Sequence, residues 1–501
     1  MNLDKVLLHF SKNGDDWTIR DAVRGTQIFG GIGSGKSSGS GKTIAKVFLK
    51  SGFGGLVLCA KPDEKDNWVR FCKETGRLDD LLIFEEGGAF EFNPLQYELN
   101  RSGKGAGEVF NLSNLFMEIY KMGNRFSGGG SSGEKDRYWD NALKRALNRM
   151  ILLLKIAGKE LSIENMIQIM SSVPTGQMTN DFANYDDNDW KSLYNSNFCI
   201  ECILDAGAVL EGKREEYDAL EEDHPTIEFI SEELSVLEAS YGTVYRYFMN
   251  EFARADEKTR SIVTESFLGL AEPFTMGILK KYFSSGVNLL PEQTHSGKII
   301  ILNFSVKEYL DAGVYAQGIY KYLWQQATER RDISQFPLPV FLWVDEAQLF
   351  LSDYDQIFQT TARSSRACTV FISQNISNYY VSIGGNNAEH KADSLLGNLG
   401  TKIFHSNTDS NTNEWASKLI GSDFISMIST SENRKRMAFF AENVGKNKSH
   451  QLLPQVLPRE FTTLKSGGEK EDLIVEGVIQ ITGKNWSNGS NFQIIEFSQK
   501  Y

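Results

Sequence analysis

The sequence predicts an α/β protein with a mostly parallel sheet and an inserted all-α domain. Three observations support this prediction: short apolar runs that alternate with helical patterns, a central stretch with helical periodicity only, and a glycine-rich segment between a β-prone run and a helix. With 501 residues, of which 41% are hydrophobic and 24% charged, the chain can form two or three domains around a sizeable core.

The short apolar runs predict the strands of the sheet. Each run is bounded by polar or glycine-containing segments and alternates with a helical pattern, as expected for parallel strands covered on both faces. The predicted strands are Thr26–Phe29, Gly55–Ala60, Leu81–Glu86, Lys298–Phe304, Pro339–Asp345, Cys368–Gln374 and Thr401–Ser406.

Between about Tyr97 and Thr264 the hydrophobic period becomes helical. Apolar residues line one face of a long helix at Trp139, Leu143, Ala146, Leu147, Met150 and Leu154. The acidic, helix-prone stretch from Asp181 to Glu238 is interpreted as a solvated outer face, with a partner-docking surface as the alternative. We therefore divide the chain into an N-terminal part of a nucleotide-binding domain (1–96), an all-α domain (97–264) and a C-terminal part (265–501).

The glycine-rich segment from Gly30 to Thr43 contains two Gly-Lys-Ser/Thr triplets, of which a phosphate-binding loop needs one. The pattern G-x-x-x-x-G-K-[ST] requires a glycine five positions before the Gly-Lys pair. Gly30 satisfies it for Lys36, whereas counting back from Lys42 reaches Lys36 instead of a glycine. The predicted phosphate cradle is Gly30, Gly33, Ser34, Gly35, Lys36, Ser37 and Ser38.

This loop predicts a site for a nucleoside triphosphate with Mg²⁺. Backbone N–H groups and the positive end of the following helix would receive the phosphates. Lys36 would reach the β and γ phosphates, and the Ser37 hydroxyl would bind Mg²⁺. The alternatives are a flexible Gly/Ser linker and, for the phosphate ligand, Lys42. Gly39 and Gly41 would lie in the first turns of the helix, where it packs closely or can move.

A second acidic element follows the predicted strand Pro339–Asp345. The buried run would deliver Asp345 and Glu346 at its carboxyl end, where ligands bind in open α/β sheets. Asp345 would hold Mg²⁺ through water, and Glu346 would act as the general base on the attacking water. Gln374 ends the next predicted strand, so its amide would sense the γ-phosphate; a polar strand cap is the alternative.

Charge and cysteine content limit the classes of function. The net charge of −12 and the pI near 5.2 exclude a protein that coats nucleic acid, so any DNA contact would be local. Five cysteines in a chain of this size indicate a reducing cytoplasm. The Cys199–Cys202 pair is interpreted as half-buried and not as a metal or redox site. The apolar runs are far shorter than the ~20 residues of a membrane span.

Together, five segments resemble the TraG/TraD type of conjugative coupling protein in the HerA/FtsK superfamily of RecA-like ATPases. They are GGIGSGKSS, the FNPLQ of Phe92–Gln96, LWVDEAQ, FISQN and GNLGTKIF, and the resemblance extends from about Thr18 to about Glu476. It implies a RecA-like P-loop core, ATP and Mg²⁺ as ligands, hexameric rings with ATP hydrolysis between subunits, and DNA drawn through a central pore. Such proteins usually carry N-terminal membrane helices, which are absent from this sequence.

The resemblance also implies an arginine supplied by the neighbouring subunit, and Arg363 and Arg366 match its location; ordinary surface arginines are the alternative. Few basic residues are candidates for a DNA-contacting pore, and for each of them taken singly solvated surface is the favoured interpretation: Lys104, Arg434, Lys435, Arg436, Lys446 and Lys448. The leading hypothesis is a cytoplasmic, ring-forming DNA translocase. The alternatives are an ATPase that docks a protein partner through the acidic helical domain and, disfavoured by Glu346, a small-molecule kinase.

Overall fold

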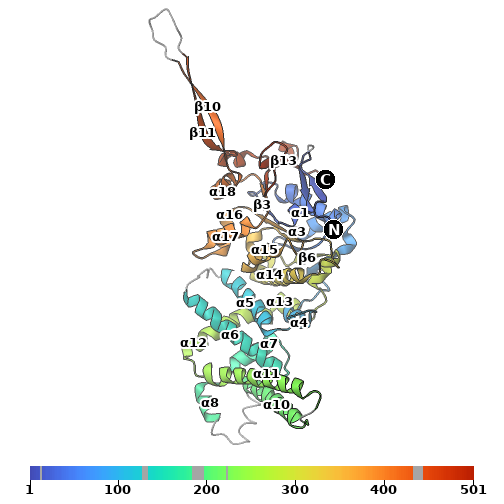
Figure 1. Ribbon diagram of the computed structural model, residues 1–501, viewed down its shortest axis with the longest axis vertical. Helices are drawn as coiled ribbons and strands as arrows, with labels where there is room; N and C mark the ends of the chain where they lie inside the picture. Colours follow the sequence, from blue (N-terminus) through green and yellow to red (C-terminus); the bar gives the residue numbers. More distant parts are fainter. Residues whose placement is uncertain (12–13, 127–133, 183–196, 222–223, 433–443, 501) are drawn as a thin grey trace, which may run out of the picture.

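The computed structural model describes residues 1–11, 14–126, 134–182, 197–221, 224–432 and 444–500. The molecule is elongated (Figure 1). A sheet-containing core, where both termini lie, occupies the middle; a helical segment extends from one end, and a long β-hairpin projects from the other.

The core is built on a nine-stranded sheet in which seven neighbouring strands are parallel. At one edge the last two strands of the chain each pair antiparallel with their inner neighbour. In spatial order the strands are β5 (Leu81–Glu85), β6 (Ile299–Asn303), β4 (Gly54–Leu58), β7 (Val340–Val344), β8 (Ala367–Ser373), β3 (Thr26–Phe29), β9 (Thr401–Phe404), β12 (Ile474–Ile481) and β13 (Phe492–Ser498). The seven predicted strands are the seven parallel ones, so the predicted fold class is confirmed.

The central strands are apolar throughout because both faces of the sheet are covered. In β7, Phe341 and Trp343 point to a core that includes Trp17 and Phe48, whereas Leu342 and Val344 point to the opposite core. Alternation along each strand thus places every side chain in one of two hydrophobic layers. The core helices are α1 (Ile19–Ala22), α2 (Lys42–Lys50), α3 (Glu64–Glu74), α14 (Val306–Arg330), α15 (Asp353–Thr361), α16 (Ile376–Ile383), α17 (Ala388–Gly397) and α18 (Ser410–Ile420).

The segment between β5 and β6 is helical in its described part. Its helices are α4 (Pro94–Asn100), α5 (Val109–Phe126), α6 (Glu134–Ile156), α7 (Ile163–Ser172), α8 (Gly176–Phe182), α10 (Phe198–Asp218), α11 (Ile227–Tyr245), α12 (Glu257–Ala271) and α13 (Gly277–Phe283). The apolar face predicted for α6 is buried, from Leu143 to Leu154. The proposed boundary at Thr264 falls inside α12, and helices continue to Phe283; the three-part division stays a proposal.

Two antiparallel hairpins lie outside the main sheet. The first pairs β1 (Val6–His9) with β2 (Asp16–Thr18), and the second pairs β10 (Ser422–Glu432) with β11 (Val444–Pro454). Of the candidate pore residues, Lys446 and Lys448 lie on β11 of the projecting hairpin, and Lys104 is exposed between α4 and α5. Arg434, Lys435 and Arg436 lie outside the described residues.

Over the described ranges, no single helix is both long and apolar enough to cross a membrane. One bent pair, Glu257–Thr275 with Gly277–Phe283, reaches the length and composition of a span, with a bend of 74° between its halves.

Candidate nucleotide site

The predicted phosphate-binding loop connects β3 to the helical layer on one face of the sheet. Gly35 has a φ of 76°, and a Cβ there would lie 2.4 Å from a methyl group of Val475. A Cβ on Gly30 would lie 2.4 Å from the Ser34 hydroxyl. The glycine spacing that selects the register is therefore also required by the packing of the loop.

The loop continues into a π-helix, Ser37–Gly41, before α2 begins at Lys42. A regular helix was expected here, and the wider π turn is a correction to that expectation. A Cβ on Gly39 would approach Val475 to 3.1 Å, so this turn packs closely against β12, as the glycines suggested. Ser40 in the same turn contacts the buried His405 ring at 2.7 Å. Burial lowers the pKa of His405 to about 4, so the ring is neutral near pH 7.

The two lysines of the glycine-rich segment occupy different environments. The Lys42 ammonium donates hydrogen bonds to the main-chain carbonyls of Gln499 and Lys500, at 3.1 and 3.0 Å. It therefore joins α2 to the last residues of the chain, and burial lowers its pKa. Lys36 precedes the π-helix and is itself buried. This difference supports the register built on Lys36.

Ser37 and Asp345 meet beyond the carboxyl ends of β3 and β7, although they are 308 residues apart in the sequence. The Ser37 hydroxyl donates a 3.0 Å hydrogen bond to the Asp345 carboxylate, and burial raises the pKa of that carboxylate. Glu64 lines the same cavity of about 150 Å³, and one of its carboxylate oxygens is buried with no hydrogen-bond partner. These oxygen donors fit Mg²⁺, which typically takes one or two carboxylates and completes its shell with phosphates and water.

Glu346 follows Asp345 in a left-handed backbone conformation, with φ 47° and ψ 50°. Its carboxylate accepts hydrogen bonds from Lys61 at 2.8 Å and from Gln348 at 2.9 Å. The Gln374 amide lies 3.3 and 3.4 Å from its two oxygens. Burial alone would raise the pKa of Glu346, but the hydrogen bonds from Lys61 and Gln348, with the charges of Lys61 and Lys36, together outweigh it, and the net shift is downward.

Sequence reasoning missed Lys61, Glu64, Gln348 and His405. For Lys61 and Glu64 there was a signal, because the charged run Lys61–Asp66 directly follows a predicted strand of the parallel sheet. The carboxyl end of every such strand faces the ligand side of the sheet. Gln348 ends the LWVDEAQ segment, and His405 lies at the carboxyl end of the predicted strand Thr401–Ser406, so the same signal was present for both.

The two candidate arginines, Arg363 and Arg366, lie at the amino end of β8, and Gln374 lies at its carboxyl end. They precede β8, whereas Gln374 follows it, which corresponds to roughly 25 Å along the strand. Arg366 donates a hydrogen bond to the Pro337 carbonyl at 2.6 Å, and Arg363 is exposed. The fold therefore does not bring either arginine to the nucleotide site of its own chain.

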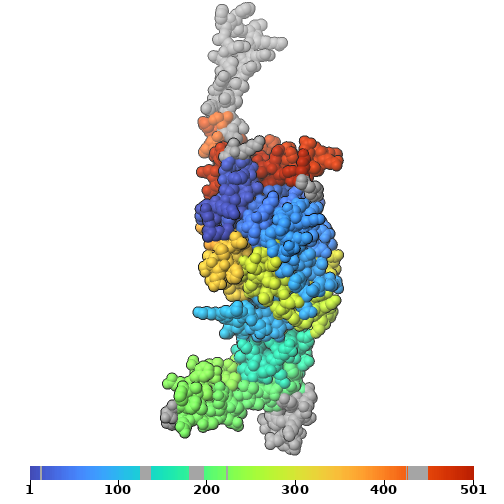
Figure 2. Space-filling model, turned by 90° about the vertical axis from the view of Figure 1, so that its right-hand side faces the viewer, coloured from blue at the N-terminus to red at the C-terminus, as the bar shows by residue number. Residues whose placement is uncertain are grey.

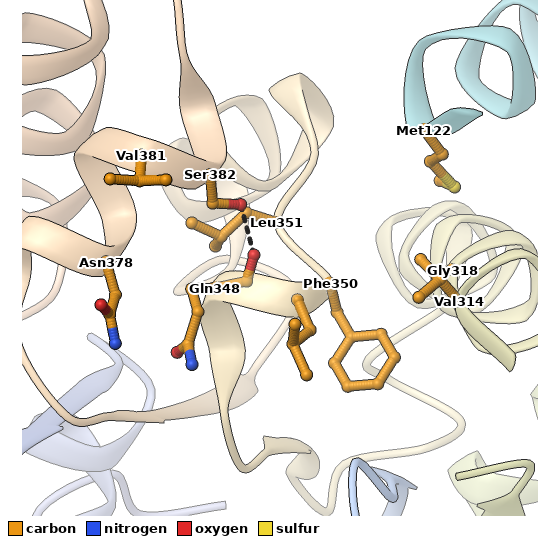
Figure 3. A pocket seen from close by; sticks show the side chains of 10 residues that line it. Met122, Val314, Gly318, Gln348, Phe350, Leu351, Asn378, Val381 and Ser382 are labelled. Carbon is orange, nitrogen blue, oxygen red and sulfur yellow. Dashed lines mark hydrogen bonds between the residues drawn. The ribbon is translucent and has the colours of Figure 1, made fainter. Parts of the chain in front are cut away.

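A larger cavity, of about 400 Å³, is lined in part by the segment that follows Glu346 in the sequence, Gln348–Leu351 (Figure 3). Gln348 forms part of its wall and accepts, through its main-chain carbonyl, a hydrogen bond from Ser382. On the far side the cavity is closed by Met122 of α5 and by Val314 and Gly318 of α14. Gln348, which donates a hydrogen bond to one oxygen of Glu346, thus also lines this cavity between the core and the helical segment.

A family model matches a C-terminal stretch of the chain. Residues 339–465 match the family model described as the TraM recognition site of TraD and TraG. The resemblance to TraG/TraD-type coupling proteins is confirmed. The matched segment contains Asp345, Glu346, both candidate arginines and Gln374, together with the β10–β11 hairpin.

The whole chain is similar in fold to the bacterial conjugative coupling protein TrwB. An unbound structure of the TrwBdeltaN70 form has a TM-score of 0.57 at 12% identity, over 99% of this chain and 89% of the other. TrwB with the GTP analogue GDPNP gives 0.55 at 13% identity, over 100% and 91%. TrwB with ADP and Mg²⁺ gives 0.55 at 12% identity, over 100% and 90%. The search of curated proteins found no match.

Proposed function

We propose that this chain is a Mg²⁺-dependent ATPase that assembles into a hexameric ring and moves DNA. The observation that carries the proposal is the meeting of the loop serine, Ser37, with the acidic pair Asp345–Glu346 at the carboxyl end of the sheet. A buried carboxylate beside a hydroxyl of a phosphate-binding loop, followed directly by a second carboxylate, suits NTP hydrolysis by water.

Each residue of the site has a role in this proposal. The loop from Gly30 to Ser38 binds the phosphates through its N–H groups, and Lys36 neutralises the β and γ phosphates. Ser37 and Asp345 would hold Mg²⁺, and Glu64 lines the same cavity. When bound, Mg²⁺ neutralises charge on the phosphate oxygens. Glu346 takes the proton of the attacking water, and Gln374, whose amide contacts Glu346, senses the γ-phosphate.

The location of the arginines supports action between subunits. Arg363 and Arg366 are remote from the site of their own chain, so in a ring they are available to the neighbouring one. Of the two, Arg363 is the better candidate, because Arg366 is engaged by Pro337. Subunits with Arg363→Ala should bind ATP without hydrolysing it, and mixing them with Lys36→Ala subunits should restore part of the turnover. Failure to restore turnover in co-assembled mixtures would argue against a shared site.

We propose that the DNA contact is local and that the protein works in the cytoplasm. Lys446 and Lys448 belong to strand β11, and with the sequence candidates Arg434, Lys435 and Arg436, which lie outside the described residues, they are the proposed DNA contacts that six subunits would repeat around a pore. The five cysteines are free and buried, in keeping with a reducing compartment. Resemblance to TraG/TraD-type proteins and a fold shared with the coupling protein TrwB support this assignment.

The decisive measurement is ATP turnover by the wild type at low salt, with and without single- and double-stranded DNA. We expect stimulation by DNA, and binding that weakens steeply as salt rises, because phosphate neutralisation releases counterions. Mass measurement with ATP and DNA should give a hexamer. If neither DNA is bound and neither changes the rate, the translocase proposal fails.

A protein-docking ATPase is the second candidate, and two observations favour it. Helix α10 carries six acidic and two basic residues, and α11 carries four acidic and none basic, so these two helices have a net charge of −8. The matched family model is itself described as a recognition site for a protein, TraM. Stimulation of turnover by a protein partner in the absence of any DNA effect would select this candidate.

A further inference from the structure

The residues that follow β13 contact the first turn after the predicted phosphate-binding loop. The side-chain amide of Gln499 donates a 2.7 Å hydrogen bond to the Ser38 hydroxyl, across 461 residues of sequence. Ser38 belongs to the predicted phosphate cradle, and both residues line the cavity of about 150 Å³ that is also lined by Ser37 and Asp345. Gln499 therefore belongs to the candidate nucleotide site.

The Gln499 side chain is held in one orientation by contacts on its other side. Its amide oxygen accepts a hydrogen bond from the main-chain N–H of Gly468 at 2.8 Å, and its own main-chain N–H donates to the Leu473 carbonyl at 2.7 Å. A main-chain N–H can only donate, so the amide oxygen faces Gly468 and the NH₂ group faces Ser38. A Cβ on Gly467 would lie 2.2 Å from the amide oxygen, so this loop packs directly against the amide. Gln499 thus presents a fixed donor to Ser38.

Lys42 fixes the main chain of the same segment. Its ammonium donates to the carbonyls of Gln499 and Lys500, at 3.1 and 3.0 Å, and its side chain is buried. Burial of an ammonium is costly unless its donors are paired, so these contacts hold the segment after β13 against α2. They give the second Gly-Lys-Thr triplet of the glycine-rich segment a role other than phosphate binding.

The direction of the Gln499–Ser38 hydrogen bond decides what the hydroxyl can do. A serine hydroxyl has one proton to donate and two lone pairs that accept. Because the Gln499 amide donates, the Ser38 oxygen accepts, and the hydroxyl proton is left for another acceptor. Its contact with the Gly35 carbonyl is long, at 3.5 Å. A phosphate oxygen in the cavity would be the better acceptor, since charge-assisted hydrogen bonds are shorter and stronger than neutral ones.

We propose that Gln499 is a positioning residue for nucleotide binding, which holds the Ser38 hydroxyl so that it donates to a phosphate of the bound nucleotide. The inference rests on the proposed ATPase function and makes the segment after β13 one wall of its site. Because Gln499 acts through Ser38 and not through the general base Glu346, it sets nucleotide affinity more than the rate of hydrolysis.

The first test is a binding titration of the full chain with ATPγS in the presence of Mg²⁺. Gln499→Met keeps the length of the side chain but removes the donor, and we expect the Kd to rise roughly 2- to 10-fold, the net contribution of one hydrogen bond. In steady-state hydrolysis KM should rise in proportion and kcat should change little, as expected when ground state and transition state lose the same contact.

Gln356→Met is the matched control. Gln356 donates a 2.6 Å hydrogen bond to the Ser394 hydroxyl, between α15 and α17, and this contact is exposed like that of Gln499 with Ser38. The control should leave the Kd for ATPγS unchanged. An unchanged Kd in Gln499→Met, or an equal rise in both variants, would overturn the proposal.

A second variant, Gln499→Glu, tests the direction of the hydrogen bond. Glutamate has nearly the same size and keeps an acceptor for Gly468. Its ionised carboxylate can only accept, so it takes up the Ser38 proton and adds negative charge beside the phosphates. We expect a larger rise in Kd than in Gln499→Met, and the excess should shrink as salt rises. Affinity equal to that of the wild type would contradict the proposal.

A double-mutant cycle shows whether Gln499 acts through Ser38. Gln499→Met should raise the Kd for ATPγS in the wild type but add nothing in Ser38→Ala, because the hydroxyl that it positions is gone. Melting temperatures measured without nucleotide show that each variant is folded. Equal effects of Gln499→Met in both backgrounds would overturn the positioning role.

Failure of this inference and failure of the proposed function give different results. A wild type that does not bind ATPγS with Mg²⁺ removes the proposed function and the role of Gln499 with it. A wild type that binds and hydrolyses ATP, with the same Kd in Gln499→Met, removes only the role of Gln499.

Discussion

The nucleotide site and the α10–α11 pair use charged residues in opposite ways. In the core, charged groups are buried in defined pairs, as in Lys321–Asp355, and at the site Glu346 is paired with Lys61. The α10–α11 pair forms a lobe at the far end of the molecule (Figures 1 and 2). Its ion pairs lie at the surface, and of α11 only Ile230 and Val244 are buried.

The difference shows that buried ion pairs of the core contribute to its stability, whereas the exposed charges of the α10–α11 pair are available for interaction. A buried ion pair that loses one partner leaves an uncompensated charge in a low dielectric, so its removal is costly. An exposed pair is screened by water and salt, so its removal costs little. The core should therefore be intolerant of charge changes, and the acidic lobe should tolerate them.

The largest effect on ATP turnover should come from replacing Lys36, one of the two lysines of the glycine-rich segment. Lys36→Ala should abolish ATP turnover, because only Lys36 has the correctly spaced glycine and lies within the loop. Lys42→Ala should retain most of it, since its ammonium binds Gln499 and Lys500. Steady-state hydrolysis by both purified variants checks this, and equal loss in both would overturn the register.

Glu346→Gln should lower kcat by roughly 10²- to 10⁴-fold, the usual contribution of a general base. Binding of Mg²⁺ and ATPγS should persist because Ser37 and Asp345 are intact. Single-turnover kinetics and a binding titration separate the two effects. Turnover close to that of the wild type would mean that another residue activates the water.

Lys321→Ala tests the buried pair between α14 and α15. Besides Asp355, the ammonium binds the Phe350 carbonyl, so its loss removes that hydrogen bond. It also leaves the buried Asp355 charge without its cation, although Ser352 and Gln325 still donate to the carboxylate. We expect a loss of about 3–5 kcal/mol in the free energy of unfolding of the core, measured by denaturant unfolding. As a control, Lys121→Ala removes the half-exposed pair with Glu118 and should cost at most about 1 kcal/mol.

The smallest effect is expected in the acidic lobe. Lys213 joins α10 to α11 by pairing with Glu233 at 2.6 Å, and it also pairs with Glu216 within α10. Lys213→Ala should leave the melting temperature and basal ATP turnover unchanged, because these pairs are exposed. A marked drop in melting temperature would show that the lobe depends on this charge, and the comparison with the core would then fail.

The sequence determined the features that depend on local pattern and spacing. Seven apolar runs predicted the seven parallel strands, because a strand buried on both faces must be apolar along its whole length. Glycine spacing selected Lys36, and an acidic pair after a buried run placed Asp345 and Glu346 at the ligand edge. The charged run from Lys61 to Asp66 carried a usable signal that was not used.

Tertiary structure alone decided the contacts between distant segments. The order of strands places β4 beside β7, and only that order brings Lys61 to Glu346; nothing in either segment encodes the other. The same holds for Lys42 and the last residues of the chain, and for Ser40 and His405. Local pattern specifies which residues form a strand and which edge their polar neighbours face. Which strands become neighbours depends on packing two complete hydrophobic layers, a property of the whole chain.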